Sequence, residues 1–256
     1  ESYAESLTYF PRLDHAGARE HVMWTERTRK EVKMPLIGSL NASSLGSWLE
    51  YAKQLESAGV DALELNMYAV ETDPLVGAED IERRTTEVIS AVKEQVSIPV
   101  SVKLSPFYTS LASFVGKAAE AGADGFVLFN RFYQPGIDPK TESLDARLDL
   151  SRSEDNRLPL RWIAILSDEI EADFVASTGI HTGTDVVKQI LAGAKATQSV
   201  SALYLHGLDY VAEMNRQIAS WMDEKGYASI EAFRGKLSQE DVTGSPNAFE
   251  RAQYVQ

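Results

Sequence analysis

The 256-residue sequence contains no cysteine. This absence excludes disulfides, thiolate metal sites and a cysteine nucleophile. Basic residues are also few, with 25 Lys and Arg against 38 Asp and Glu and a net charge of -13. Because a predominantly acidic surface repels phosphate backbones and anionic lipids, we expect neither nucleic acid nor a membrane as a partner.

Long apolar runs are missing as well. No stretch approaches the roughly 20 apolar residues that span a bilayer. The first ten residues, "ESYAESLTYF", lack the basic start and apolar centre of a signal peptide. The sequence therefore predicts a soluble, cytoplasmic protein, and its 44% hydrophobic residues suffice for a packed core.

From residue 34 onward one pattern repeats: a short apolar run, a loop, and an amphipathic helix that ends near "AG". Strands alternating with helices of this length predict βα units on a parallel sheet, with the glycine at each helix C-terminus. A long polar loop is expected at 134–156. Six such units fit an open sheet, or a barrel of eight strands that lacks two. Strands are predicted at 34–40, 62–67, 99–105, 125–130, 173–178 and 197–201.

The loop "STGIHTGTD" separates the strand at 173–178 from the next helix. Small residues before a helix N-terminus can present backbone N–H groups to a phosphate, although most such loops are plain turns. His181 and His206 lack carboxylate or cysteine partners at metal-binding spacing, so we expect no metal site.

Five motifs carry a resemblance to a known family: "ELNMY", "VKLSPF", "VLFNRFYQP", "TGIHTGTD" and "GYASIEAFRGKLS". In this order they resemble the dihydroorotate dehydrogenase family, most closely its bacterial dihydroorotate dehydrogenase-like branch. The resemblance implies one FMN-binding (β/α)8 barrel domain over 1–256. In that register 1–33 is a lead-in helix, 34–205 carries strands three to eight without the first two βα units, and 206–256 forms C-terminal helices and a tail.

The resemblance implies where FMN binds. In the family the loops after the last two strands hold the FMN phosphate, which points to the backbone of Thr178, Gly179, Val200 and Ser201. The branch usually has two glycines where this chain has Thr178 and Gly179, so the threonine could crowd the phosphate or donate to it. Lys103 corresponds to the lysine at the flavin N1–C2=O edge, where a cation stabilises reduced FMN. The alternative is a lysine that reaches the rim.

Asparagines at strand ends are the candidate substrate ligands. The resemblance implies that Asn66 and Asn130 contact flavin or orotate, and Asn41 is a weaker candidate on the flavin side. All three could instead be loop caps. Glu64 lies on the same strand face as Asn66 and could pair with Lys103.

The base of the reaction is harder to assign. The family places a cysteine or serine a few residues after the strand-end asparagine, but this chain has Ala69 there. Tyr68 or Glu71 could replace it as the catalytic base. Arg131 could bind a substrate carboxylate or form a surface salt bridge.

Three functions therefore stay open. The first is an FMN-dependent oxidoreductase that converts dihydroorotate to orotate in pyrimidine biosynthesis. The second is a flavin oxidoreductase for another small carboxylated ring compound, and the third is a flavin-free, non-enzymatic barrel remnant. The expected partner is a small-molecule substrate, and a homo-oligomer is compatible with the sequence.

Overall fold

The core of the molecule is a parallel sheet of six strands, hydrogen-bonded in the order β1-β2-β3-β4-β7-β8. The computed structural model describes residues 18–67, 69–145, 149–241 and 248–251. Each strand of this sheet overlaps a segment for which the sequence predicts one, so the prediction of these six strands is confirmed. The strands are β1 (Ile37–Leu40), β2 (Ala62–Asn66), β3 (Val100–Leu104), β4 (Gly125–Leu128), β7 (Asp173–Ser177) and β8 (Ala196–Gln198).

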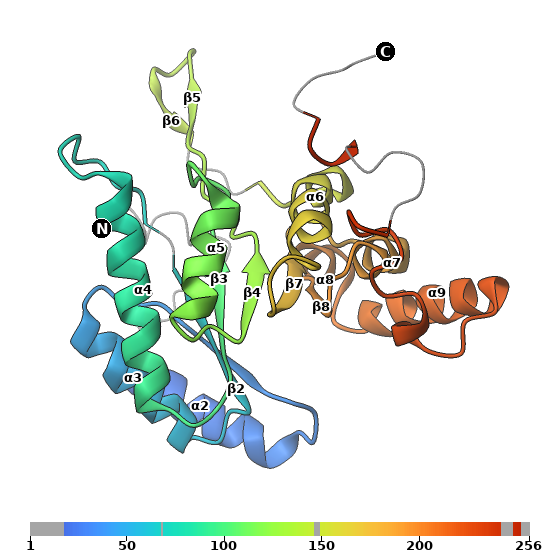
Figure 1. Cartoon of the computed structure of the whole chain (residues 1–256), viewed down its shortest axis with the longest axis horizontal. Coiled ribbons are helices and arrows are strands. Elements are labelled where there is room, and N and C mark those ends of the chain that lie inside the picture. Colours follow the sequence, from blue (N-terminus) through green and yellow to red (C-terminus); the bar gives the residue numbers. More distant parts are fainter. Residues whose placement is uncertain (1–17, 68, 146–148, 242–247, 252–256) are drawn as a thin grey trace.

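A helix follows each strand before the chain returns to the sheet (Figure 1). The sheet is curled. The evidence is a contact between Gln198 on β8 and Glu64 on β2, two strands that have three others between them in the sheet. Alternating strands and helices around a curled parallel sheet form a partial (β/α)8 barrel, which confirms the predicted fold class. Within the described residues the sheet has β1 and β8 as its end strands.

The helices agree with the apolar periodicity of the sequence. The glycines of the "AG" repeats, Gly59, Gly122 and Gly193, have φ values of 91°, 109° and 116° directly after the helix ends, as a C-terminal glycine requires. The α-helices are α2 (Ala18–Glu31), α3 (Leu45–Ser57), α4 (Ala78–Gln95), α5 (Leu111–Glu120), α6 (Arg157–Leu166), α7 (Gly183–Leu191), α8 (Ser201–His206) and α9 (Tyr210–Lys225).

The expected polar loop at 134–156 contains regular structure. Two short antiparallel strands, β5 (Gly136–Asp138) and β6 (Ser143–Asp145), form a hairpin that projects from the barrel (Figure 1). A 3-10 helix, η2 (Ser153–Asn156), then leads into α6. Because the hairpin is exposed and has few apolar residues, it leaves no apolar pattern in the sequence.

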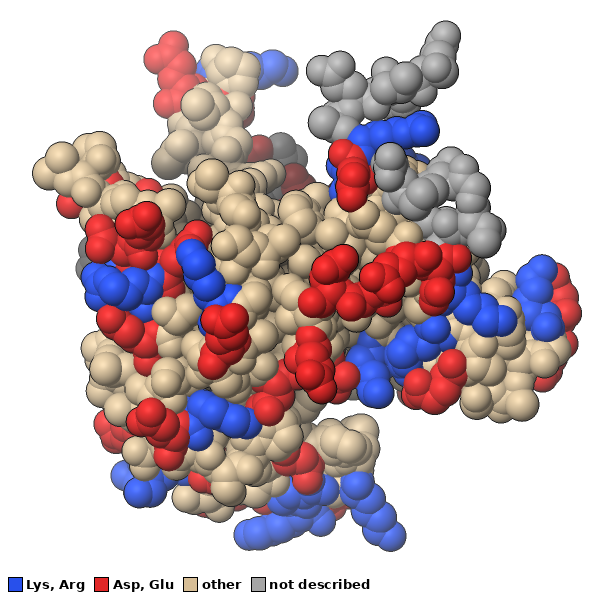
Figure 2. Space-filling model, in the orientation of Figure 1, with Lys and Arg blue, Asp and Glu red and all other residues tan. Residues whose placement is uncertain are grey.

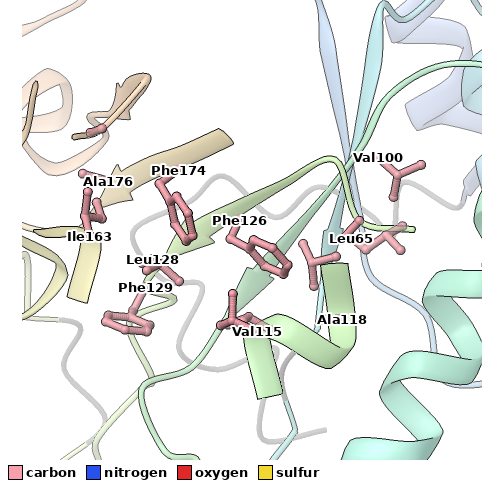
Figure 3. Close-up of a cluster of buried hydrophobic side chains, with 14 of the residues drawn as sticks. Leu65, Val100, Val115, Ala118, Phe126, Leu128, Phe129, Ile163, Phe174 and Ala176 are labelled. Atoms are coloured by element: carbon pink, nitrogen blue, oxygen red, sulfur yellow. The ribbon is translucent and has the colours of Figure 1, made fainter. Parts of the chain in front are cut away.

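The core lies between the sheet and the helices that cover it. Phe126 on β4 and Phe174 on β7 are buried side by side, with ring centroids 5.8 Å apart (Figure 3). Val115 and Ala118 of α5 pack in the same cluster (Figure 3). All four residues of β4 are buried, which explains why this strand reads as a continuous apolar run.

The outer surface carries charges of both signs. Figure 2 shows acidic and basic side chains interspersed on one face of the molecule. None of the described helices combines the length and apolar character needed to cross a membrane.

Candidate active site

A cavity of about 170 Å³ opens at the carboxyl ends of β3, β4, β7 and β8. The carboxyl ends of the strands are where (β/α)8 barrels place their active sites. Its described lining includes two cationic side chains and no carboxylate, in a chain whose net charge is -13. The lining residues are Lys103, Asn130, Arg131, Ser151, Ser177, Thr178, Gly179, Ile180, Gln198, Val200 and Ser201.

Lys103 lies near the end of β3, and its side chain is only 18% exposed. Its ammonium donates a hydrogen bond to Gln198 Oε1 at 2.8 Å and lies 3.9 Å from Glu64 Oε1. The lysine therefore lines the cavity and has a buried carboxylate beside it. The sequence left open whether Glu64 pairs with Lys103, and the structure shows this contact.

Glu64 is a buried carboxylate in the interior of the curled sheet. It accepts hydrogen bonds from Ser39 Oγ on β1 at 2.8 Å and from Gln198 Nε2 on β8. Burying a charge is costly unless it is paired and hydrogen-bonded. Lys103 provides the opposite charge, and Ser39 and Gln198 provide the hydrogen bonds. Residues of β1, β2, β3 and β8 thus meet in one polar network.

The three asparagines that the sequence singles out lie together. Asn130 Nδ2 donates to Asn66 Oδ1 at 2.6 Å, and Asn41 Nδ2 donates to the backbone carbonyl of Asn66 at 2.8 Å. Asn130 lines the cavity directly. Asn66 and Asn41 reach it only through this chain of amides.

The loop after β7 has an unusual backbone. Thr178 and Gly179 have φ values of 79° and 76°, in the left-handed region that favours glycine. The threonine hydroxyl donates to the carbonyl of Phe129 at 3.0 Å, so its proton is not directed at the cavity. A Cβ on Gly179 would lie 2.4 Å from the backbone nitrogen of Asn156, so only glycine fits there. No described residue accepts a hydrogen bond from the N–H of Thr178 or Gly179.

The N-terminus of α7 already has a carboxylate partner. Asp185 accepts hydrogen bonds from the N–H groups of His181 and Thr182, and Thr182 caps the helix in return. Burial would raise the pKa of Asp185, but hydrogen bonds from Ser153, Thr182 and His181 outweigh it and lower that pKa. The helix N-terminus is thus occupied, whereas the N–H groups of Thr178 and Gly179, just after β7, have no acceptor in the described part of the chain.

A chain of hydroxyl groups lies at the other side of the cavity. Ser151 Oγ lies 2.9 Å from Ser201 Oγ and 3.1 Å from His181 Nε2. Sequence reasoning identified Ser201 but missed Ser151, which follows the hairpin, and Gln198, which lies within a predicted strand. The polar Gln198 in an otherwise small-residue strand was the one available signal. Val200 is 76% exposed at the rim.

Two of the remaining candidates, Arg131 and Glu71, already have described partners. Arg131 lines it, but its guanidinium donates to the backbone carbonyl of Asp149. Glu71 forms an ion pair with Arg84 at 2.9 Å, and the hydrogen bond from Arg84 lowers the pKa of Glu71. Tyr68 lies outside the described residues. In the described part of the chain no cluster of three or more metal-ligating side chains occurs.

The fold and this site define a class: a (β/α)8-type barrel with a cavity at the carboxyl ends of its strands whose described lining carries two cationic side chains. The family model for dihydroorotate dehydrogenase matches residues 13–222. The chain therefore belongs to the dihydroorotate dehydrogenase family, as the motifs indicated. This is a family of oxidoreductases that are generally flavin-dependent.

Similar proteins carry consistent names. The chain is 30% identical to a dihydroorotate dehydrogenase B (NAD(+)), catalytic subunit, of Thermoplasma volcanium, with 91% of this chain and 78% of the relative aligned. The protein of the same name from Thermoplasma acidophilum gives the same identity and coverage. The one from Methanosarcina acetivorans is 30% identical over 85% of this chain and 70% of its own length.

Proposed function

We propose that this chain is an FMN-dependent oxidoreductase that converts dihydroorotate to orotate, a step of pyrimidine biosynthesis. The observation that carries the proposal is the cavity with Lys103 and Arg131 and without a described carboxylate in its lining, at the barrel end where the family has its chemistry. In this proposal the chain acts as one FMN-binding domain on a small-molecule substrate.

The phosphate of FMN would bind between the loops after β7 and β8. The unpaired N–H groups of Thr178 and Gly179 can donate to it, and the backbone of Val200 and the hydroxyl of Ser201 line the same cavity. Barrels of this type commonly hold a phosphate after their last two strands. Thr178 and Gly179 both line the cavity, which supports this use.

Lys103 would lie against the pyrimidine edge of the flavin. When bound, FMN would accept a hydride from the substrate ring. A positive side chain at that edge stabilises the negative charge that reduction leaves on the flavin. Asn41 would act on the flavin side through the backbone carbonyl of Asn66, to which it donates.

The substrate would be recognised by amides and a guanidinium. Asn66 and Asn130 can each donate and accept, as the ring amides of a pyrimidine require. Arg131 can bind a carboxylate once it leaves the carbonyl of Asp149. Tyr68 and Glu71 are the candidate bases. The lowered pKa of Glu71 keeps it ionised but makes it a weak base.

A spectroscopic experiment tests the proposal. The purified chain is incubated with FMN and desalted, and retained flavin is measured by its absorbance. Dihydroorotate is then added without oxygen, and loss of the oxidised-flavin bands reports hydride transfer. We expect retained FMN and substrate-dependent bleaching.

The same experiment separates the alternatives. Retained FMN with no bleaching by dihydroorotate would favour another small carboxylated ring substrate, which Ala69 at the family's base position supports. A chain that retains no FMN would contradict the proposal and leave the flavin-free remnant.

A further inference from the structure

The strongest unused feature of the site is the polar network behind Lys103. Gln198 lies between two opposite charges: its carbonyl accepts from the Lys103 ammonium at 2.8 Å and its amide N–H donates to the Glu64 carboxylate. The two charged groups are 3.9 Å apart at their nearest atoms. The amide therefore stands where a direct, shorter ion pair would otherwise form.

A hydroxyl group on β1 also holds the Glu64 carboxylate in place. Ser39 on β1 donates to the carboxylate oxygen that lies nearer the lysine, at 2.8 Å. The Glu64 side chain is 5% exposed, whereas Lys103 faces the cavity. The network thus has a fixed buried anion at the back and a cation at the front.

This arrangement controls how much positive charge the cavity receives. A carboxylate beside the ammonium offsets part of its field at any ligand, and the offset grows as the two charges approach. Gln198 lies between them, hydrogen-bonds to both and itself lines the cavity. Neither Glu64 nor Gln198 needs to touch a ligand to have this effect.

We infer that Glu64 and Gln198 are positioning residues that set the affinity of the site for reduced relative to oxidised flavin through Lys103. The inference rests on the proposed function, since it assumes that flavin occupies the cavity. It assigns the two residues opposite effects. Glu64 weakens the positive field of Lys103 at the flavin, and Gln198 preserves that field.

Two substitutions should therefore shift the reduction potential of the bound flavin in opposite directions. Glu64→Gln removes the offsetting charge, so reduced flavin should gain about tenfold in affinity over oxidised flavin, which for a two-electron couple is a rise of about 30 mV. Gln198→Leu removes the spacer, so Lys103 should move toward Glu64 and the potential should fall. If the substitutions only made the site less ordered, the reduction potential would shift in the same direction in both variants.

The measurement is the two-electron reduction potential of FMN bound to the full chain, for the native protein and each variant. Glu82→Gln is the matched control, because Glu82 also pairs with a lysine, Lys117 at 2.8 Å, but on the outer helices α4 and α5. If Glu64→Gln does not fold, Glu64→Asp should give a smaller rise. The inference would be overturned if the potentials of the Glu64 and Gln198 variants shifted no more than that of the Glu82→Gln control. It would also be overturned if both potentials shifted in the same direction.

A second measurement needs no flavin. Thermal unfolding of Glu64→Gln, Lys103→Met and the double variant should give losses in Tm that do not add, because the two side chains share one network. Additive losses would overturn the positioning role. A native chain that binds no FMN, with non-additive losses, would instead overturn the proposed function and leave the positioning of Lys103 by Glu64 standing.

Discussion

Asp185 is a buried carboxylate that ties the start of α7 to η2. It accepts from Ser153 Oγ at 2.9 Å and from Asn156 Nδ2 at 2.9 Å, besides its own helix N-terminus. Its pKa in the folded chain is lowered, so ionised Asp185 stabilises the fold at pH values above the ordinary carboxyl pKa. That contribution is lost as the pH falls through the lowered pKa.

We expect Asp185→Asn to reduce the free energy of unfolding by about 1–3 kcal/mol at pH 7, since an amide cannot accept all of these hydrogen bonds. The difference from the native chain should shrink as the pH falls below the ordinary carboxyl pKa of about 3.9, because the carboxyl of the unfolded chain protonates there before the folded one does. Urea unfolding at pH 7 and in acid measures both. Asp209→Asn, at an exposed helix start without a side-chain cap, is the control. If the native chain and the Asp185→Asn variant differed in free energy of unfolding as much in acid as at pH 7, ionised Asp185 would not be the stabilising group.

Gly179 and Gly46 form a second matched pair. Gly179→Ala places a Cβ against the backbone of Asn156 at positive φ, and we expect a loss of at least about 2 kcal/mol together with weaker FMN binding. Gly46→Ala, in the first turn of α3 with no atom within 4 Å of its Cβ, should stabilise by up to about 1 kcal/mol. Denaturant unfolding and FMN titration test both variants. If the two variants had the same stability and FMN affinity, the loop after β7 would have to relax around the methyl group added at position 179.

Single residues were predictable where chemistry stands out locally. Lys103, Asn66 and Asn130 are polar residues at or near the ends of apolar strands, and the structure brings them to one end of the barrel. Gln198 was missed because its partner, Glu64, is 134 residues away and meets it only when the sheet curls. Ser151 was missed because its position depends on the hairpin before it.

At the scale of elements, the βα frame and the hairpin contribute differently to stability. Phe174→Ala should cost about 3–5 kcal/mol, because Phe174 is buried against Phe126 on the neighbouring strand. Ile137→Thr in β5 should change stability by no more than about 0.5 kcal/mol, because Ile137 is 75% exposed. Chemical unfolding of the two variants tests the contrast. A large loss from Ile137→Thr would show that the hairpin packs on the barrel.

The same contrast explains which elements could be predicted. Strands and helices of the βα frame bury one or both faces, so apolar residues recur along them at the spacing of a strand or a helix. The glycines after α3, α5 and α7 mark helix ends for a backbone reason, and their positions were also predicted. β5 and β6 are three residues each and pair mainly with each other. Such a hairpin leaves only Gly and Pro as signals, which also suit an irregular loop.

At the scale of the whole molecule, an acidic chain forms a cavity with a cationic lining. The sequence could not show this, because net charge is an average and the cavity draws residues from three strands and from loops that are distant in the chain. Glu64 is buried behind Lys103 and Gln198 and is not part of the described cavity lining, whereas Lys103 and Arg131 are. The fold therefore selects which charges a ligand meets.

The sequence resemblance predicts the catalytic base at position 69, where this chain has an alanine. Ala69 is exposed in the loop after β2 and carries no group that can take a proton. A positioned general base is worth about 10²–10⁴ in rate. If neither Tyr68 nor Glu71 replaces it, dihydroorotate should reduce the bound flavin slowly, while orotate still binds through Asn66 and Asn130.

Ala69→Cys should then raise the rate of anaerobic flavin bleaching by about 10²–10⁴ and leave orotate affinity close to that of the native chain. The gain should grow with pH as the thiol ionises near pH 8.5, because the thiolate is the base. Ala69→Val, which adds bulk without a proton acceptor, should give no gain. Fast bleaching by the native chain, abolished by Tyr68→Phe or Glu71→Gln and not improved by the cysteine, would instead assign the base to that residue.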